Sequence, residues 1–156
     1  MRIGILSDTH RMETYIDKAI PYLYSCDLII HAGDNFADSK YIHKITNKDI
    51  IAVKGNCDFI DVEEEIVFEI QGKTIFLCHG DIYSVKYGLD KIEEKAKELE
   101  ADIVIFGHTH VPLRIEKDNI LYLNPGSISL PREGSNRQFI LMDIEDDKIS
   151  LEEVII

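Results

Sequence analysis

Residues 2–10, with the sequence RIGILSDTH, decide the fold class, because an apolar run of strand length ends directly in a polar loop. Behind this loop, apolar residues recur with helical spacing at Ile16, Ala19, Ile20 and Leu23, so we expect a helix up to about residue 24. A strand, a polar loop and a helix in this order are typical of α/β proteins.

The same succession of elements continues along the chain. Apolar runs predict strands at residues 28–31, 50–53, 66–70, 74–78, 103–106, 113–116, 120–123, 139–144 and 149–156, and helices are expected at 38–46 and 87–100. Strands and helices alternate in the first half, whereas strands dominate the second. This order predicts an α/β fold in which sheets pack on one another and helices cover the outside. We expect one domain over residues 1–156, since no linker or repeat interrupts the chain.

Composition and charge argue against several classes of protein. No apolar run approaches the roughly 20 residues that span a bilayer, and the first residues lack the pattern of a secretory signal. We therefore expect neither a secretory signal nor a membrane partner. The 3 cysteines are an odd number without a CxxC pair, which favours a cytoplasmic location. A net charge of -12 repels phosphate backbones and therefore disfavours strong nonspecific nucleic-acid binding.

Side chains that ligate metals follow five of the expected strands, at the sheet edge where open α/β sheets bind ligands. These residues are Asp8 and His10, Asp34, Asn56, His79, and His108 with His110. Two of the sets place side chains two positions apart. In an extended backbone such a pair points to one face of the chain, so each pair is expected to reach one metal.

The types of side chain indicate which metals to expect. Carboxylate oxygen, imidazole nitrogen and amide oxygen suit Mn, Fe, Co, Ni or Zn better than Ca or Mg. A single catalytic zinc uses about three protein ligands, so the seven candidates suggest two ions that share a carboxylate. Such paired ions activate a water molecule for hydrolysis. Taken singly, Asp8 or Asp34 is explained as well by a helix cap and Asn56 by a turn, but independent caps and turns have no reason to form a complete ligand set.

Five short motifs resemble those of the calcineurin-like metallophosphoesterase superfamily, in the same order. They are Asp8-Thr9-His10, Gly33-Asp34, Gly55-Asn56-Cys57-Asp58, His79-Gly80-Asp81 and Gly107-His108-Thr109-His110. The short length, the cysteine in the third motif and the segment Asn124-Pro125-Gly126-Ser127 are similar to the small single-domain phosphodiesterases of bacteria and archaea. The resemblance covers essentially the whole chain. It implies an αββα sandwich of two mixed β-sheets flanked by helices, with the metals at the strand ends.

The resemblance also implies a role for each position. The expected ligands form two groups joined by one carboxylate: Asp8, His10 and His110 for the first metal, Asn56, His79 and His108 for the second, and Asp34 as the bridge. Manganese is the expected metal, with Ni, Fe, Co and Zn as alternatives. Asp34, Asn56 and His108 are the candidate catalytic residues, and a hydroxide activated by the metals would attack phosphorus in line.

Cys57 stands where the wider superfamily commonly has a histidine, and it is a candidate determinant of substrate choice. Without that imidazole, a diester is favoured over a dianionic monoester. The alternative is a small buried residue with no influence on the substrate. His31 is expected to be a hydrogen-bonded core or supporting residue, and Asp58 and Asp81 either hydrogen-bond the ligand imidazoles or shape turns. Arg132 either approaches a substrate phosphate or is an ordinary surface residue.

Hydrolysis of a small phosphodiester substrate is therefore the leading expectation. A phosphomonoesterase or protein phosphatase is the alternative enzyme. A non-catalytic interaction scaffold of the same fold is the alternative of a different class, since a subunit of the retromer complex resembles this branch and is thought to work through protein contacts. A scaffold is free to lose metal ligands, whereas this chain keeps all seven. A homodimer is left open.

Overall fold

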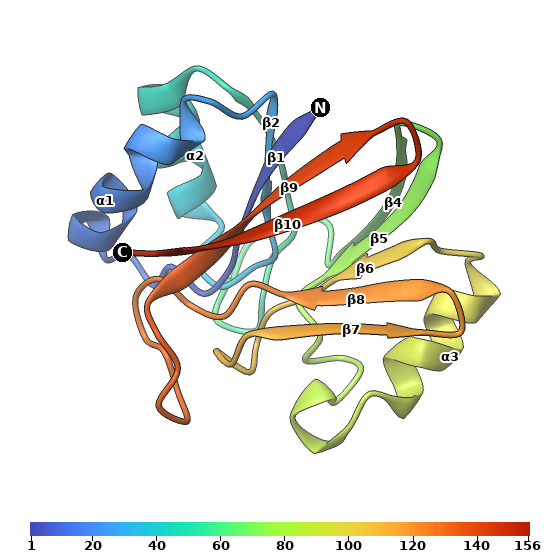
Figure 1. Ribbon diagram of the computed structural model, residues 1–156. Coiled ribbons are helices and arrows are strands. Elements are labelled where there is room, and N and C mark those ends of the chain that lie inside the picture. Colours follow the sequence, from blue (N-terminus) through green and yellow to red (C-terminus); the bar gives the residue numbers. More distant parts are fainter.

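The computed structural model describes residues 1–156 and places two five-stranded sheets face to face, with helices outside them (Figure 1). In spatial order, the first sheet contains β10 (Lys148–Ile155), β9 (Gln138–Glu145), β1 (Arg2–Leu6), β2 (Leu28–His31) and β3 (Asp49–Ala52). The second sheet contains β4 (Glu65–Ile70), β5 (Lys73–Cys78), β6 (Ile103–Ile105), β8 (Ile120–Asn124) and β7 (Leu113–Lys117).

Both sheets are mixed. In the first sheet β1, β2 and β3 run parallel, and β9 pairs antiparallel with β1 and with β10. In the second sheet β5, β6 and β8 run parallel, and β4 and β7 form antiparallel edges. The expected sandwich of two mixed sheets flanked by helices is confirmed.

The helices form the two outer layers of the sandwich. Helices α1 (Glu13–Leu23) and α2 (Ala37–Thr46) pack on the first sheet, and α3 (Asp90–Glu98) packs on the second. The core between the sheets consists of aliphatic side chains from both, such as Ile5 of β1 and Ile105 of β6. Burial of these side chains holds the two sheets in a fixed relation, which also fixes the loops at their strand ends.

The expected helix at residues 87–100 is the one clear error in the predicted elements. A 3₁₀ turn, η1 (Val85–Tyr87), comes first, and α3 begins only at Asp90. Between them Gly88 has a φ of 137°, which no α-helix contains and which glycine adopts without a Cβ clash. The other expected elements are present, with ends that differ by one or two residues.

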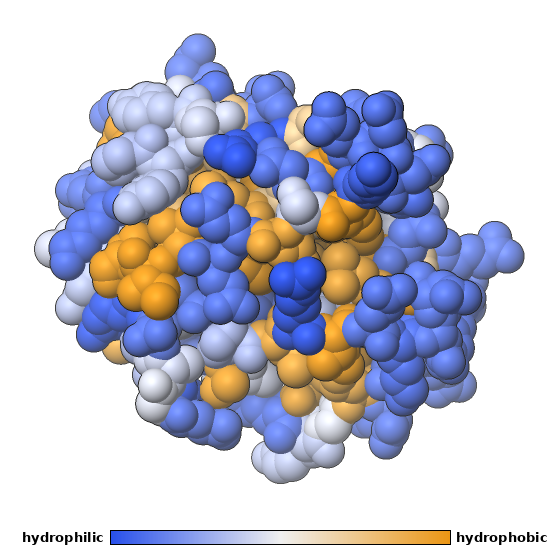
Figure 2. All heavy atoms as spheres, viewed as in Figure 1, coloured by the Kyte–Doolittle hydropathy of each residue, from blue (hydrophilic) through white to orange (hydrophobic).

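The surface over β7–β10 carries apolar side chains in separate patches, each bordered by hydrophilic ones (Figure 2). One of these patches lies where Figure 1 places the C-terminal end of β10, and Ile155 there is 59% exposed. None of the helices has the length and apolar character needed to cross a membrane. The homodimer stays a prediction.

Candidate metal centre

The polar loops that follow the parallel strands meet at one edge of the sandwich. The Asp8 backbone N–H donates to the Gly33 carbonyl (2.9 Å), which joins the loops after β1 and β2. The Gly107 N–H donates to the His79 carbonyl (3.0 Å), which joins the loops after β6 and β5. Because these loops come from both sheets, side chains distant in sequence converge here.

The backbone at this edge is not extended, which corrects one expectation. Asp8, His10, His108 and His110 have φ values of 54°, 48°, 68° and 59°, in the left-handed region. The premise of an extended backbone is therefore wrong, although Asp8 and His10 still reach one common cluster. The tight turns instead separate His108 from His110 and direct them to different neighbours.

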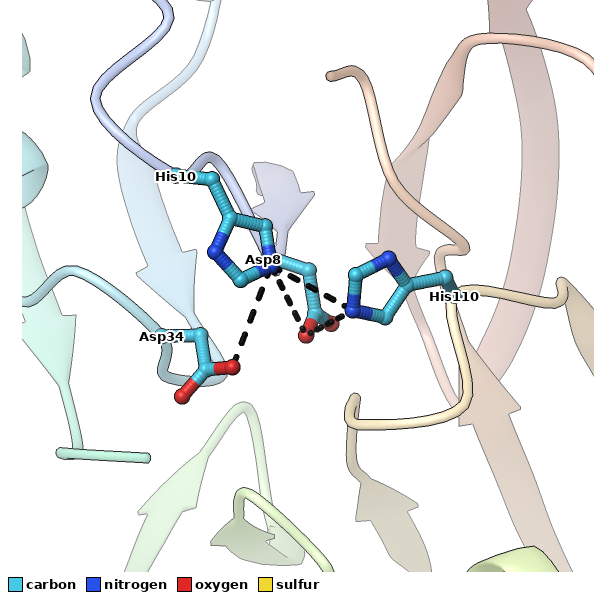
Figure 3. Close-up of side chains that lie close together, drawn as sticks. All are labelled: Asp8, His10, Asp34 and His110. Carbon is cyan, nitrogen blue, oxygen red and sulfur yellow. Dashed lines mark hydrogen bonds and ion pairs between the residues drawn. The ribbon is translucent and has the colours of Figure 1, made fainter. Parts of the chain in front are cut away.

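Four of the expected ligands form one cluster, in which one potential ligand atom from each residue lies within 4.8 Å of the others: Asp8, His10, Asp34 and His110 (Figure 3). The His110 Nε2 lies 3.1 Å from Asp8 Oδ1 and 3.3 Å from the His10 Nε2. The His10 Nε2 is also 3.8 Å from Asp34 Oδ2. Nitrogen and carboxylate atoms of the kinds that bind transition metals therefore surround one point.

His79 and His108 form a second group beside this cluster. The His108 Nδ1 lies 3.2 Å from the His79 Nε2, which in turn lies 3.4 Å from Asp34 Oδ1. Asp34 thus faces His10 with one carboxylate oxygen and His79 with the other. The shared position expected for Asp34 agrees with this geometry.

Asn56 is less closely integrated than the other candidates. Both Asn56 and Cys57 are exposed, and the hydrogen bond of the Asn56 side chain goes to the Cys57 sulfur (3.6 Å). The backbone N–H of Cys57 donates to Asp34 Oδ1 (2.9 Å), so this loop still supports the shared carboxylate. Although Cys57 is exposed as a whole, partial desolvation of its thiol, followed by the Asp34 carboxylate, raises the pKa of Cys57 to about 11.

Two glycines allow the loops to approach this closely. A Cβ on Gly55 would lie 2.6 Å from the Asp34 backbone nitrogen, and a Cβ on Gly107 would lie 2.7 Å from Asp8 Oδ2. Either contact would displace one of the two carboxylates. The glycines of the sequence motifs are thus required by packing around the carboxylates.

The arrangement of hydrogen-bond donors and acceptors in the cluster suits a bound cation. The Nδ1 atoms of His79 and His110 each lie 2.7 Å from a backbone carbonyl, of Ala32 and Leu130, and can only donate to it. In the neutral rings the Nε2 atoms therefore turn lone pairs toward the carboxylates. Asp8 Oδ1 is buried and has no hydrogen-bond donor, while Oδ2 already accepts two hydrogen bonds. The Nε2 lone pairs and the carboxylate oxygens are all acceptors, so their close approach is favourable only with a positive charge between them. A metal ion would supply this charge, and the hydrogen bonds to backbone carbonyls would hold the histidines in place to bind it.

The pKa shifts agree with this requirement. Burial alone would raise the pKa of Asp8, but the neighbouring imidazoles of His110 and His79, which favour the ionised carboxylate, outweigh burial, and the pKa is lowered. Burial lowers the pKa of both His10 and His108. The carboxylate is thus ionised and these two imidazoles are neutral near pH 7, which are the forms that ligate metals.

A buried hydrogen-bonded chain supports the first loop. His31 accepts from the Gly33 N–H at Nδ1 and lies 3.0 Å from the Thr9 hydroxyl at Nε2, and Thr9 donates to Asp38. His31 is a fully buried, hydrogen-bonded residue, as expected. Asp58 accepts from the backbone N–H of Gly55 and of Phe36 and shapes its own turn. No imidazole is hydrogen-bonded to Asp58 or Asp81, so the turn interpretation is confirmed for Asp58.

The sequence did not reveal how strongly a distant segment supports the site. The Ser127 hydroxyl donates to the Asp8 carbonyl (2.7 Å), and Ser129 donates to the Thr9 carbonyl (2.6 Å). Asn124 donates to the Gly107 carbonyl (2.7 Å) and so anchors the loop that carries His108. In the sequence, only the turn composition of residues 124–127 indicated this support. Ser127 and Ser129 lie more than a hundred residues from the carbonyl groups that they contact, so the contacts leave no local pattern.

A sandwich of two mixed sheets with clustered carboxylates and imidazoles at its strand ends defines the metallophosphoesterase fold. A family model described as the calcineurin-like phosphoesterase superfamily domain matches residues 1–147. The chain belongs to this superfamily, as its motifs indicated. A phosphodiesterase of Methanocaldococcus jannaschii is 35% identical over 145 residues, which cover 81% of this chain and 83% of that protein. Further bacterial and archaeal relatives are described as probable metallophosphoesterases.

Solved structures share the same architecture. A predicted phosphoesterase from Streptococcus pneumoniae matches with a TM-score of 0.85 and 29% identity over 99% of this chain and 88% of that one. A variant of Vps29 from Entamoeba histolytica matches with a TM-score of 0.80 and 22% identity over 100% of this chain and 99% of that one. The second likeness shows the fold alone.

Proposed function

We propose that the protein is a metal-dependent phosphodiesterase that works with two divalent ions. The observation that supports this most directly is the position of Asp34, because its two carboxylate oxygens face imidazoles of two different groups. A carboxylate placed in this way can bridge two ions, as dinuclear hydrolytic sites commonly use. The carboxylate and imidazole ligands favour manganese, with Ni, Fe, Co and Zn as alternatives.

In this proposal the ligands divide as the two groups of contacts divide. The first ion would be held by Asp8, His10 and His110 and the second by His79 and His108, with Asp34 shared by both. Asn56 is assigned to the second ion by its motif position. When bound, the ions lower the pKa of a water molecule and neutralise charge on the phosphoryl oxygens. The hydrogen bonds of His79 and His110 to backbone carbonyls hold these two rings in orientation and select the tautomer that ligates.

His108 and Asn56 are the ligand side chains of the second group that reach solvent, as His10 does in the first group. His108 is partly exposed and Asn56 is exposed, whereas Asp8, Asp34 and His79 are buried. We assign these two residues to contact with the phosphoryl group as well as to the metal, because a substrate approaching from solvent meets them first. The Asp34 carboxylate stays behind them and keeps its position through the Cys57 N–H.

The preference for diesters is supported by Cys57. A thiol has no cationic form, so it offers no positive charge beside the second negative charge of a monoester. A diester carries only one negative charge and depends less on such a group. The description of the related archaeal protein as a phosphodiesterase agrees with this choice of substrate.

The direct test is a comparison of matched aryl esters on metal-free protein reconstituted with Mn, Zn, Ni, Co or Fe. Turnover of bis(p-nitrophenyl) phosphate and p-nitrophenyl phenylphosphonate should exceed turnover of p-nitrophenyl phosphate, and EDTA should remove all of it. Faster monoester turnover would establish the phosphomonoesterase alternative. Absence of turnover with every metal would refute the enzyme and leave the interaction scaffold.

A further inference from the structure

A cavity of about 430 Å³ opens beside the loop that carries His108 and His110. Its apolar wall consists of Val85, Leu89, Phe106, Val111, Pro112 and Leu113. Sites that bind small organic molecules have volumes of about 300–1,000 Å³ and mostly apolar linings. The cavity therefore has the size and character of a binding site for one small organic group.

The cavity adjoins the metal centre through the chain itself. Thr109, which lies between the two histidines of the loop, forms part of its lining. On one side the Val85 N–H donates to the Gly80 carbonyl (3.3 Å), next to His79. On the other side the Arg132 N–H donates to the His110 carbonyl (3.3 Å). Both walls are thus attached to the loops that carry the expected metal ligands.

The charges around the cavity suit an anionic molecule. Lys86 and Arg132 outnumber Glu133, the one carboxylate in the lining, although the chain as a whole has a net charge of -12. Lys86 follows Val85 in η1, and the Arg132 N–H donates to the His110 carbonyl, so both cations belong to segments attached to the loops that carry the expected ligands. An anionic phosphoryl group bound at the metals would lie within reach of the same positive charges.

Part of the apolar wall is exposed to solvent. Phe106 and Val85 are buried, but Leu89, Val111, Pro112 and Leu113 are only half-buried. A small polar ester group would leave this surface in contact with water, whereas an aryl ring or another large apolar group would cover it.

We propose that this cavity binds the ester arm that remains on phosphorus, and that the natural substrate is a phosphodiester with an aromatic or similarly large apolar arm. The inference rests on the proposed phosphodiesterase function and adds the class of substrate to it. Leu89, Val111 and Leu113 determine the specificity by contact with the arm, and Lys86 and Arg132 attract its phosphate.

The test compares phenylphosphonate with methylphosphonate, which share the phosphonate group and mimic the products of diester hydrolysis. Both are titrated into the Zn²⁺-loaded protein and into the metal-free protein with labelled Leu and Val methyl groups, and binding is followed by NMR. On the Zn²⁺-loaded protein, phenylphosphonate should bind at least about tenfold more tightly than methylphosphonate. It should also shift the methyl signals of Leu89, Val111 and Leu113. Equal affinities, or shifts confined to other parts of the molecule, would overturn the assignment.

Two variants locate the effect. Leu89→Gln and Leu113→Gln should each reduce the advantage of phenylphosphonate to about twofold or less and leave the affinity for methylphosphonate unchanged. Val67→Gln, at a 46% exposed position on β4 outside the cavity, is the matched control and should keep the full advantage. An unchanged advantage in both cavity variants, or equal losses for both probes, would also overturn the assignment.

The experiments distinguish a failure of the cavity assignment from a failure of the proposed phosphodiesterase function. If the cavity binds phenyl groups but no metal supports diester hydrolysis, the proposed function fails and the binding site stands as a site for aryl anions. If diesters are hydrolysed but the phenyl group adds no affinity, the proposed function stands and the assignment of the cavity fails.

Discussion

The Nε2 atom of His110 lies 3.1 Å from Asp8 Oδ1, although residues 8 and 110 are separated by about two thirds of the chain. The other ring nitrogen of His110 faces the Leu130 carbonyl and must carry a proton. The inner nitrogen therefore has a lone pair in the neutral ring, directed at a carboxylate oxygen that has no other donor. Either a proton or a metal ion resolves this contact, and the competition between them determines how the protein responds to metals and to pH.

The first prediction concerns the number of metal ions. Two divalent ions should bind per chain, and Asp34→Asn should reduce the occupancy of both sites, because Asp34 contacts both groups of histidines. Elemental analysis of the reconstituted proteins measures the stoichiometry. Asp17→Asn, on an exposed carboxylate that accepts from Tyr41, is the control and should keep both ions. A saturating value of one ion in the unaltered protein would refute the dinuclear model.

The second prediction concerns pH. Burial alone would lower the pKa of His110, but the hydrogen bond and charge of Asp8 outweigh burial and raise it above the ordinary value. As the pH falls, His110 therefore takes up a proton before His10 and His108, whose pKa values are lowered by burial, and this proton must leave before a metal binds. Below that pKa, metal affinity should fall about tenfold per pH unit for each proton displaced.

Competition titrations with a chromophoric chelator at pH 8 and pH 6 measure this dependence. His43→Gln should not change it, because His43 lies in α2 and hydrogen-bonds the Lys48 carbonyl, away from the centre. Equal metal affinities at the two pH values would contradict the assignment of imidazole ligands.

The third prediction concerns the segment that supports the first loop. The Ser127 hydroxyl donates to the Asp8 carbonyl and accepts from the Ser129 and Leu130 N–H groups. Ser127→Ala leaves these buried groups without a partner and should lower the free energy of unfolding by about 1–3 kcal/mol. It should also weaken metal binding, since the Asp8 loop loses its anchor. Urea denaturation of metal-free protein measures the first effect. Ser25→Ala, which removes an exposed hydroxyl, should change stability by less than about 0.5 kcal/mol.

The strand ends were predictable from sequence because their signal is local. Five of the apolar runs have the length of a strand and are followed by ligand-type residues, as Leu28–His31 is followed by Asp34. Since parallel strands end at the same edge of a sheet, the convergence of these residues followed from the order of the elements. Their division between two groups came from the family resemblance, and the contacts of His108 with His79 agree with it.

Other features were not predictable because they depend on contacts between distant segments. The left-handed turns at His10 and His110 are imposed by the loop connections and leave no periodic pattern in the sequence. The support of Asp8 by Ser127 joins residues 119 positions apart. The cavity beside Thr109 is likewise formed by segments from η1, β7 and the loop before β9, and no single segment shows it.

The last prediction concerns Cys57, which is exposed at the edge of the centre and donates its backbone N–H to Asp34. Replacing it with histidine would introduce a group that can carry a positive charge and donate a proton to a leaving group. Such a contribution is typically worth about 10²- to 10⁴-fold in rate, and a dianionic monoester gains more from it than a diester does. Cys57→His should therefore raise the ratio of monoester to diester turnover by about tenfold or more.

Cys57→Ala is the control, because it removes the thiol without adding an imidazole, and it should leave the ratio unchanged. Steady-state rates on p-nitrophenyl phosphate and bis(p-nitrophenyl) phosphate, at equal metal occupancy, measure both variants. If the ratio in Cys57→His equals that of the unaltered protein, Cys57 has no part in substrate choice, and the diester preference must come from the shape of the site.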